Sequence, residues 1–283
     1  MKIKEVKSHI IQYDLKEELG YSQQYYQKRT GHLVEVVTDE GITGWGECFG
    51  PGNVAIANKV IVERVIQPMI LGENPLNRDV LWHKVYNLLR DHGQKGMPIQ
   101  ALSGVDIALW DILGKVTGLS ISRLIGGRFR EQVPVYGYGM MLRREKLPAL
   151  MDRFRDEAAA IKSSGFVATK MKVGLGPKQD VQLAESVRRG VGGDFPFMVD
   201  ANHCYTVDQA LYVGRALEEL DAYWFEEPVA PEDLDGYREL RSQLTINIAG
   251  GEAEFTRWGW RNLLEKHCLC LLYTSDAADD DTR

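Results

Sequence analysis

Three acidic residues follow short apolar runs at equal intervals in this 283-residue chain. Asp200, Glu226 and Glu252 each come after such a run, and each is 26 residues from the next. Apolar runs of this length are typical of buried parallel strands. A strand, its helix and two loops occupy about 31 residues in a (β/α)8 barrel. The spacing therefore predicts three successive barrel strands, each with one acid at its C-terminal end.

These three acids are candidate metal ligands. Barrel active sites are built at the C-terminal ends of the strands, and hard carboxylate oxygens suit Mg²⁺, with Mn²⁺ as an alternative. A single acid is more often a solvated surface charge, so the equal spacing is what favours the metal site. We predict that Asp200, Glu226 and Glu252 share one cation.

Two lysines precede this set by one repeat, in Lys170-Met171-Lys172. Side chains two apart on a strand point to the same face, so both ammonium groups should enter the barrel mouth while Met171 packs outward under a helix. Each ammonium should lower the pKa of the other, and a lysine with a lowered pKa can act as a general base. A strand end whose lysines simply reach solvent is the alternative.

The rest of the chain reads as an α/β protein. Strands are expected at 3–13, 32–38 and 42–47, followed by helices at 53–71, 78–92 and 98–117. From 133 onward strands at 133–138, 166–172, 196–200, 223–226 and 245–249 alternate with helices. The polar and aromatic segment 16–30 is long for a hairpin connection, which predicts a functional loop there.

Composition excludes some classes of partner. A net charge of −6 leaves no basic excess for phosphates, so we expect neither nucleic-acid nor membrane binding. No apolar run approaches the roughly 18 residues of a membrane span, and the first residues lack the apolar stretch of a signal peptide. The four cysteines show neither a disulfide framework nor a zinc spacing. The simplest location is the cytoplasm, with reduced thiols.

Several segments together resemble the mandelate racemase/muconate lactonizing enzyme branch of the enolase superfamily. In the second half they are 170–172, 199–202, 224–228 and 249–252, and in the first half they are 44–47, 101–111 and 124–128. The resemblance covers roughly residues 1–267. A narrower likeness, to acid-sugar cycloisomerases of this branch, is carried by 90–96 and 200–207.

The resemblance implies an α+β capping domain over residues 1–128 and an incomplete modified (β/α) TIM barrel over 129–268, with about five of eight strands. Residues 269–283 resemble translated sequencing-library adapter, so we expect a non-native tail with no sixth parallel strand that aims an acid or histidine at the metal site. A genuine acidic tail, solvated and disordered, is the alternative.

The resemblance also implies Mg²⁺-dependent abstraction of a proton next to a carboxylate, with Lys172 as base and Lys170 as its partner. The expected substrates are acid sugars or their lactones, acted on by a cycloisomerase or dehydratase. Alternatives are a racemase or epimerase of a 2-hydroxy acid or amino-acid derivative, an inactive fragment, or a non-catalytic structural protein. Because the expected barrel is incomplete, the enzyme activity is expected of the complete protein, and this chain by itself is expected to be inactive. The family's capping-domain loop, here within 16–30, closes over the barrel mouth and selects substrate.

Four further residues are candidates for substrate binding or for supporting the ligands: Asn202, His203, Tyr21 and Tyr25. Glu227 should point away from the ligand face, because neighbouring strand residues alternate. The expected partner is a small-molecule carboxylate, and the complete protein is expected to be a homo-oligomer.

Overall fold

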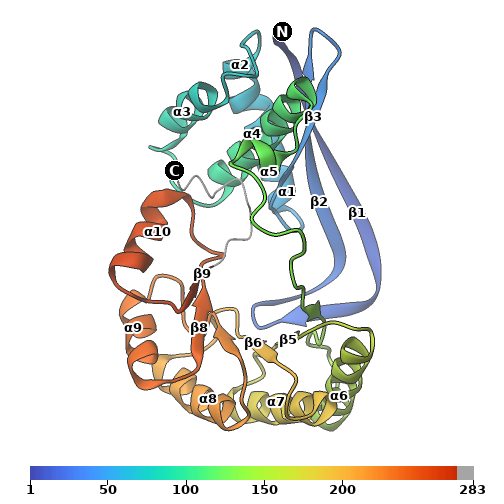
Figure 1. Ribbon diagram of the computed structural model, residues 1–283, viewed down its shortest axis with the longest axis vertical. Coiled ribbons are helices and arrows are strands. Elements are labelled where there is room, and N and C mark those ends of the chain that lie inside the picture. Colours follow the sequence, from blue (N-terminus) through green and yellow to red (C-terminus); the bar gives the residue numbers. More distant parts are fainter. Residues whose placement is uncertain (273–283) are drawn as a thin grey trace.

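The computed structural model describes residues 1–272, which form two helix-covered sheets (Figure 1). The first sheet is antiparallel and contains β1 (Ile3–Tyr21), β2 (Gln24–Thr38) and β3 (Thr43–Cys48) in chain order. The second is parallel and holds β4 to β9, also in chain order. The α/β class and the order of the two parts are as predicted.

Helices follow the sheet in the first part, and they pack against the sheet or against one another. They are α1 (Val54–Val60), the π-helical η1 (Ile61–Ile66), α2 (Gln67–Ile70), α3 (Arg78–Leu89), α4 (Met97–Thr117) and α5 (Ile121–Leu124). Helix α4 lies very close to β3, because a Cβ atom on Gly46 would be 2.0 Å from the carbonyl oxygen of Gly104. Glycine at this position is therefore a packing requirement.

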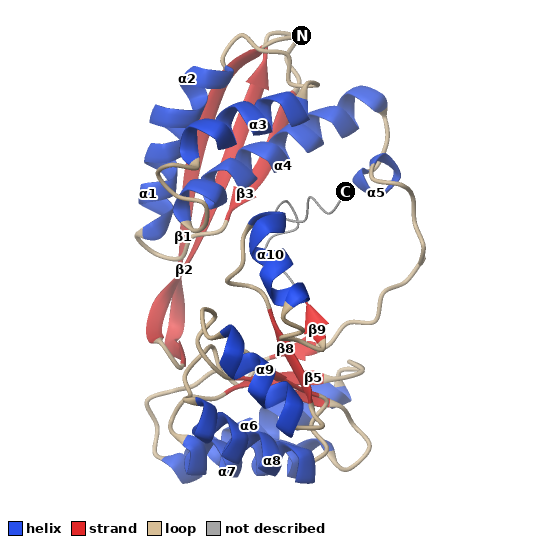
Figure 2. Cartoon of the chain, turned by 90° about the vertical axis from the view of Figure 1, so that its left-hand side faces the viewer, coloured by secondary structure: helices blue, strands red, loops and turns tan. Residues whose placement is uncertain are grey.

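Segment 16–30 is not a loop, and this prediction is wrong. Strands β1 and β2 stay paired as far as Tyr21 and Gln24, and the register shift near this segment lies between Asp14 and Leu19. Polar residues on both faces hid the strand period, whereas aromatic side chains such as Tyr25 and Tyr26 suit a paired hairpin. The hairpin reaches from the first part to the second (Figure 2).

The second part alternates strands and helices. Its strands are β4 (Gly137–Tyr138), β5 (Thr169–Lys172), β6 (Phe197–Asp200), β7 (Trp224–Glu226), β8 (Asn247–Gly250) and β9 (Leu271–Leu272). Its helices are α6 (Leu147–Ser163), α7 (Pro177–Val191), α8 (Val207–Glu219), α9 (Leu234–Gln243) and α10 (Thr256–Glu265). The predicted strands are found at the expected places, although the first is only two residues long.

The parallel sheet has six strands rather than the five predicted. Leu271 and Leu272 pair with Ala249 and Gly250, so the sheet continues past residue 268. The apolar Leu-Leu pair forms a strand because it can pair with the edge of β8. Neither residue is an acid or a histidine. The remainder of the predicted tail, 273–283, lies outside the described residues.

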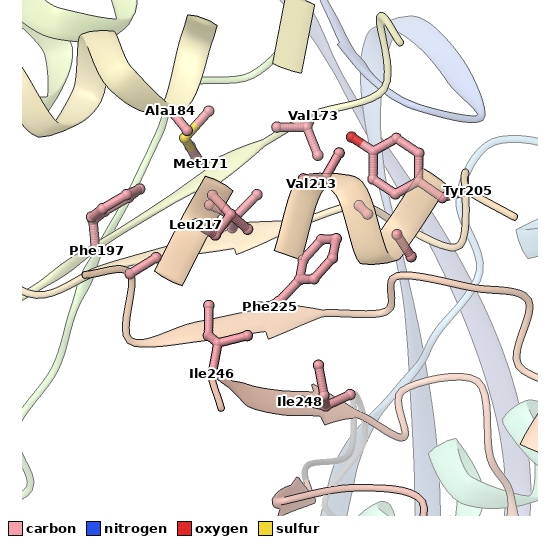
Figure 3. Packing of buried hydrophobic residues seen from close by; sticks show 14 of the residues in the cluster. Met171, Val173, Ala184, Phe197, Tyr205, Val213, Leu217, Phe225, Ile246 and Ile248 are labelled. Carbon is pink, nitrogen blue, oxygen red and sulfur yellow. The ribbon is translucent and has the colours of Figure 1, made fainter. Parts of the chain in front are cut away.

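An apolar core fills the space between the parallel sheet and its helices (Figure 3). Met171 is fully buried in this core together with Ala184 of α7, as predicted for the residue between the two lysines. Within residues 1–272, no helix combines the length and apolarity needed to cross a membrane.

Candidate active site

Two lysines and two carboxylates meet at the C-terminal ends of β5, β6 and β7. Lys172, Asp200 and Glu226 are direct neighbours in the strand register. Lys170 lies two residues before Lys172 on the same face of β5. All four side chains are at least nine-tenths buried, and Asp200 is completely buried. The sheet therefore brings together, as predicted, the two lysines and the first two acids.

Each ammonium group contacts a carboxylate directly. Lys170 Nζ lies 2.6 Å from Glu226 Oε1 and 3.4 Å from Asp200 Oδ2. Lys172 Nζ donates a short hydrogen bond to Asp200 Oδ2. The other oxygen of Asp200 accepts from the backbone N–H of Asn202 at 3.0 Å. These contacts compensate the charges that burial would otherwise penalise.

The predicted lowering of the lysine pKa values is wrong for this arrangement. Burial disfavours the charged form of Lys170 and Lys172, but Asp200 raises the pKa of both, together with Glu226 at Lys170 and Tyr138 at Lys172. Lys170 does lower the pKa of Lys172, yet this repulsion is smaller than the attraction of Asp200. The sequence did not show how close the carboxylates would be.

The carboxyl groups of the site also have shifted pKa values. Burial opposes ionisation of Asp200, but Lys172, Glu226 and Lys170 together outweigh burial and lower that pKa. Burial, together with the charge of Asp200, raises the pKa of Glu226 to about 7. Burial and the charge of Glu252 raise the pKa of Glu227 to about 8. The carboxyl groups lie close together, so the negative charge of one disfavours ionisation of its neighbours.

Glu252 does not follow the same register as the first two acids. The residue paired with Glu226 on β8 is Ala249, three positions earlier, so Glu252 lies beyond the strand in a turn. The equal spacing in the sequence therefore does not place all three acids at equivalent positions in the strand register. Among residues 1–272, no three His, Cys, Asp or Glu side chains form a ready-made metal site. The role of Glu252 as a ligand stays a prediction.

Three residues beyond β6 and β7 have left-handed backbone conformations. Asn202, His203 and Glu227 have φ values of 42°, 55° and 42°. Such conformations are costly for residues other than glycine and cluster at functional sites. They also explain why Glu227 fails to point away as predicted, since strand alternation ends at Glu226. Glu227 Oε2 lies 3.5 Å from Asn202 Nδ2 and 3.8 Å from His203 Nε2.

An aromatic wall faces the lysines. The Tyr138 ring centre is 5.7 Å from the ammonium groups of both Lys170 and Lys172. The Tyr21 ring lies 5.9 Å from Lys172 Nζ. Burial raises the pKa of Tyr138, so its hydroxyl stays protonated as a hydrogen-bond donor. At these distances the rings make cation–π contacts with the ammonium groups.

A cavity of about 990 Å³ opens beside this site, between the hairpin, the first part and the barrel. Its lining includes Tyr21, Tyr138, Lys172, Asn202, His203 and Glu252, together with hairpin residues 24 and 26–30 and residues 47–54 between the end of β3 and the start of α1. Of the lesser candidates, Tyr21, Asn202 and His203 therefore reach the cavity. Burial lowers the pKa of His203, which favours its neutral form.

The hairpin tip is attached to the barrel next to the cavity. Ser22 Oγ and Gln23 Nε2 donate to the carbonyl oxygen of Asn202 at 3.0 and 2.8 Å. Tyr25 is not among the described residues that line the cavity, and its ring lies 4.3 Å from the guanidinium of Arg144 instead. Tyr21 thus faces the site, whereas Tyr25 fixes the hairpin to the barrel.

The donor set suits a hard divalent cation. Asp200, Glu226 and Glu252 offer only oxygen atoms, which Mg²⁺ and Mn²⁺ prefer. In addition, the buried Oδ1 of Asn202 accepts no hydrogen bond from any described residue, which leaves an oxygen available for a cation or its water. The residues present therefore fit such an ion in their chemistry.

Sequence reasoning missed Tyr138 and Trp224 and misjudged Glu227. Tyr138 pairs with Lys170 in the sheet, and Trp224 lies two residues before Glu226 on the same strand. The period of two along a strand could have identified Trp224. Glu227 could not be placed, because its turn conformation leaves no signal in the sequence.

Comparisons with known proteins agree with this architecture. Residues 14–126 match the family described as mandelate racemase/muconate lactonizing enzyme, N-terminal domain, and residues 153–273 match the enolase C-terminal domain-like family. The chain is 40% identical over 264 residues to a D-galactarolactone cycloisomerase of Agrobacterium fabrum, covering 93% of this chain and 68% of that protein. This agrees with the narrower likeness read from the sequence.

Two further proteins extend the comparison. An arabinonate dehydratase of Saccharolobus solfataricus is 35% identical over 85% of this chain, which spans only 63% of that enzyme. The structure of a racemase from Streptomyces coelicolor A3(2) with bound magnesium superimposes with a TM-score of 0.87 at 31% identity, covering 94% of this chain and 74% of that one. The chain belongs to the mandelate racemase/muconate lactonizing enzyme branch of the enolase superfamily.

Proposed function

We propose that the protein removes the proton from the carbon next to the carboxylate of an acid sugar or its lactone, and that elimination follows. The reaction is then a cycloisomerisation or a dehydration. The observation that carries this proposal is the pair of buried lysines on β5, held against Asp200 and Glu226 beside a large cavity. A buried group with a shifted pKa beside a cavity is a typical sign of acid–base chemistry.

The residues have distinct roles in this proposal. Asp200, Glu226 and Glu252 hold Mg²⁺ or Mn²⁺, and Lys172 is the base. Lys170 lies 2.6 Å from Glu226, where its charge offsets the carboxylates. When bound, the cation supplies positive charge that stabilises the ene-diolate formed from the substrate.

Lys172 must lose its proton before it can act as a base. In the arrangement described, Asp200 accepts its hydrogen bond and holds it in the charged form. When the oxygens of Asp200 bind another group in place of Lys172, they stabilise the Lys172 ammonium less. The pKa of Lys172 then falls.

The lining of the cavity suits a polyhydroxylated acid. Amide and hydroxyl side chains of Gln24, Asn202, Gln100 and Tyr138 can bind hydroxyl groups, and Arg29 adds positive charge for a carboxylate. Similarity to enzymes named for galactarolactone and arabinonate supports this substrate class.

Epimerisation is the second candidate, and His203 favours it. His203 lines the same cavity as Lys172, and its lowered pKa leaves a neutral imidazole that can exchange a proton. A non-catalytic role fits the site less well, since burying Glu226 and Glu227 destabilises the fold without a structural benefit.

A substrate screen in D2O tests the proposal. The protein is incubated with Mg²⁺ and a panel of aldonates, aldarates and their lactones, and the α-proton signal is followed by NMR. Loss of that signal with an unsaturated or rearranged product indicates elimination, whereas a deuterated epimer indicates epimerisation. Activity should disappear in EDTA. Retention of every α-proton across the panel would contradict the proposal.

A further inference from the structure

We propose that Trp224 is a positioning residue that fixes the carboxylate of Glu226 in the orientation needed to bind the cation. The inference rests on the proposed function, because it takes Glu226 as a metal ligand. Trp224 begins β7 and lies two residues before Glu226, so both side chains leave the strand on the same face.

The contact is a hydrogen bond from the indole to the carboxylate. Trp224 Nε1 donates to Glu226 Oε2 at 2.9 Å. Lys170 Nζ lies 2.6 Å from the other oxygen, Oε1. Each carboxylate oxygen therefore has a donor, and rotation of the carboxyl group would break at least one of these hydrogen bonds.

Trp224 is itself held in place by its neighbours. Tyr136 packs edge-on against the indole, with ring centres 5.6 Å apart. The ammonium of Lys170 lies 5.6 Å from the centre of the Tyr136 ring. Trp224, Glu226, Lys170 and Tyr136 thus form a closed circuit of contacts, in which the indole and the ammonium orient the same carboxylate from two sides.

A second tryptophan shows that this hydrogen bond is not a general requirement of the fold. Trp260 on α10 is 7% exposed, and its Nε1 has no hydrogen-bond partner within residues 1–272. The fold therefore tolerates a buried indole N–H without an acceptor. At Trp224 the same group is directed at a predicted metal ligand.

Groups that hydrogen-bond a ligating carboxylate typically contribute 10- to 100-fold to metal affinity. Trp224→Phe keeps an aromatic ring for Tyr136 and removes the N–H donor. We expect this variant to bind Mn²⁺ at least about 10-fold more weakly than the unaltered protein. Trp260→Phe, which removes an unpaired N–H, should bind Mn²⁺ with unchanged affinity.

The test is calorimetric titration of Mn²⁺ into the unaltered chain, Trp224→Phe, Trp260→Phe and Glu226→Gln, with circular dichroism to verify folding. Weakened binding in Trp224→Phe and Glu226→Gln alone supports the inference. Weakened binding in Glu226→Gln but not in Trp224→Phe overturns it and leaves the proposed metal site intact. Unchanged binding in Glu226→Gln overturns both.

A second measurement applies if Trp224→Phe does not fold. The indole N–H resonance of Trp224 is assigned in the ¹⁵N-labelled, unaltered protein and followed as Mg²⁺ is added. The inference predicts a saturable shift of this resonance, with the Trp260 resonance as an internal control. A Trp224 resonance that stays fixed while Mg²⁺ binds would overturn the inference.

Discussion

At the scale of single residues, the site contains charged groups that burial destabilises and that neighbouring opposite charges stabilise. Asp200 and Glu226 are buried beside two ammonium groups, and Glu227 adds a third buried carboxyl. The lysines stabilise Asp200 in its charged form, whereas the pKa values of Glu226 and Glu227 are raised to about 7 and about 8. Such a site destabilises the folded state in return for groups that can exchange protons near neutral pH.

The raised pKa of Glu227 should make the stability of the folded protein depend on pH. Its folded pKa of about 8 lies above that of an unfolded glutamate, so the folded state binds a proton that the unfolded state releases. Stability should therefore fall as pH rises from about 4.5 to about 8. Glu227→Gln should remove this loss and stabilise the protein by on the order of 2–4 kcal/mol at pH 9, with little effect at pH 5.

Urea denaturation at both pH values measures the difference, with exposed Glu219→Gln as the control. Equal stability of Glu227→Gln and the unaltered protein at pH 9 would show that Glu227 is not held in a costly position.

The sequence predicted part of the site because strand geometry is regular. Lys170, Lys172, Asp200 and Glu226 lie on strands, where a period of two and a repeated βα unit determine their positions. Glu252 and Glu227 lie beyond the ends of the strands, so neither spacing nor alternation could place them. The lysine pKa values depend on distances between residues far apart in the chain.

At the scale of secondary-structure elements, close packing determines where glycine is required. Helix α4 approaches β3 so closely that a Cβ on Gly46 would lie 2.0 Å from a backbone oxygen. Gly31 on β2 has no atom within 4 Å of the corresponding position. The strands and helices were predicted largely from their apolar periods, but the hairpin was not, because both of its faces carry polar residues.

Replacing each of these two glycines by alanine gives a matched comparison. Gly46→Ala forces α4 away from the sheet and should destabilise the protein by about 1–3 kcal/mol, as overpacking typically does. Gly31→Ala should be neutral or slightly stabilising, since it meets open space and restricts the unfolded chain. Thermal and urea denaturation measure both. A harmless Gly46→Ala would mean that α4 does not pack as described.

At the scale of the whole molecule, the hairpin connects the two parts. Gly20 and Leu142 exchange two backbone hydrogen bonds of 2.8 Å. Nearby, Arg143 lies 3.2 Å from Glu17 and Arg144 lies 2.6 Å from Glu18. The hairpin covers one side of the cavity, so these contacts connect the position of the hairpin to access to Lys172.

Amide hydrogen exchange tests this connection. Solvent-exposed ion pairs each contribute about 0.2–1 kcal/mol, so Glu17→Gln combined with Glu18→Gln should speed exchange at Gly20 and Leu142 by roughly 2- to 30-fold. Exchange at Val34 in the core of the first sheet should not change. Glu5→Gln, which removes a pair with Lys7 elsewhere on the sheet, is the control. Unaltered exchange at both amides would show that the ion pairs do not hold the hairpin.

The central claim is that Lys172 is the base that removes the α-proton, and solvent exchange tests it most directly. The unaltered protein, Lys172→Ala and the exposed control Lys178→Ala are incubated with Mg²⁺ and an acid-sugar lactone in D2O. We predict that Lys172→Ala loses α-proton exchange by at least about 100-fold, a typical contribution of general base catalysis, while Mn²⁺ affinity is nearly retained. Lys178→Ala should exchange at the unaltered rate. Exchange at the normal rate in Lys172→Ala would contradict the account.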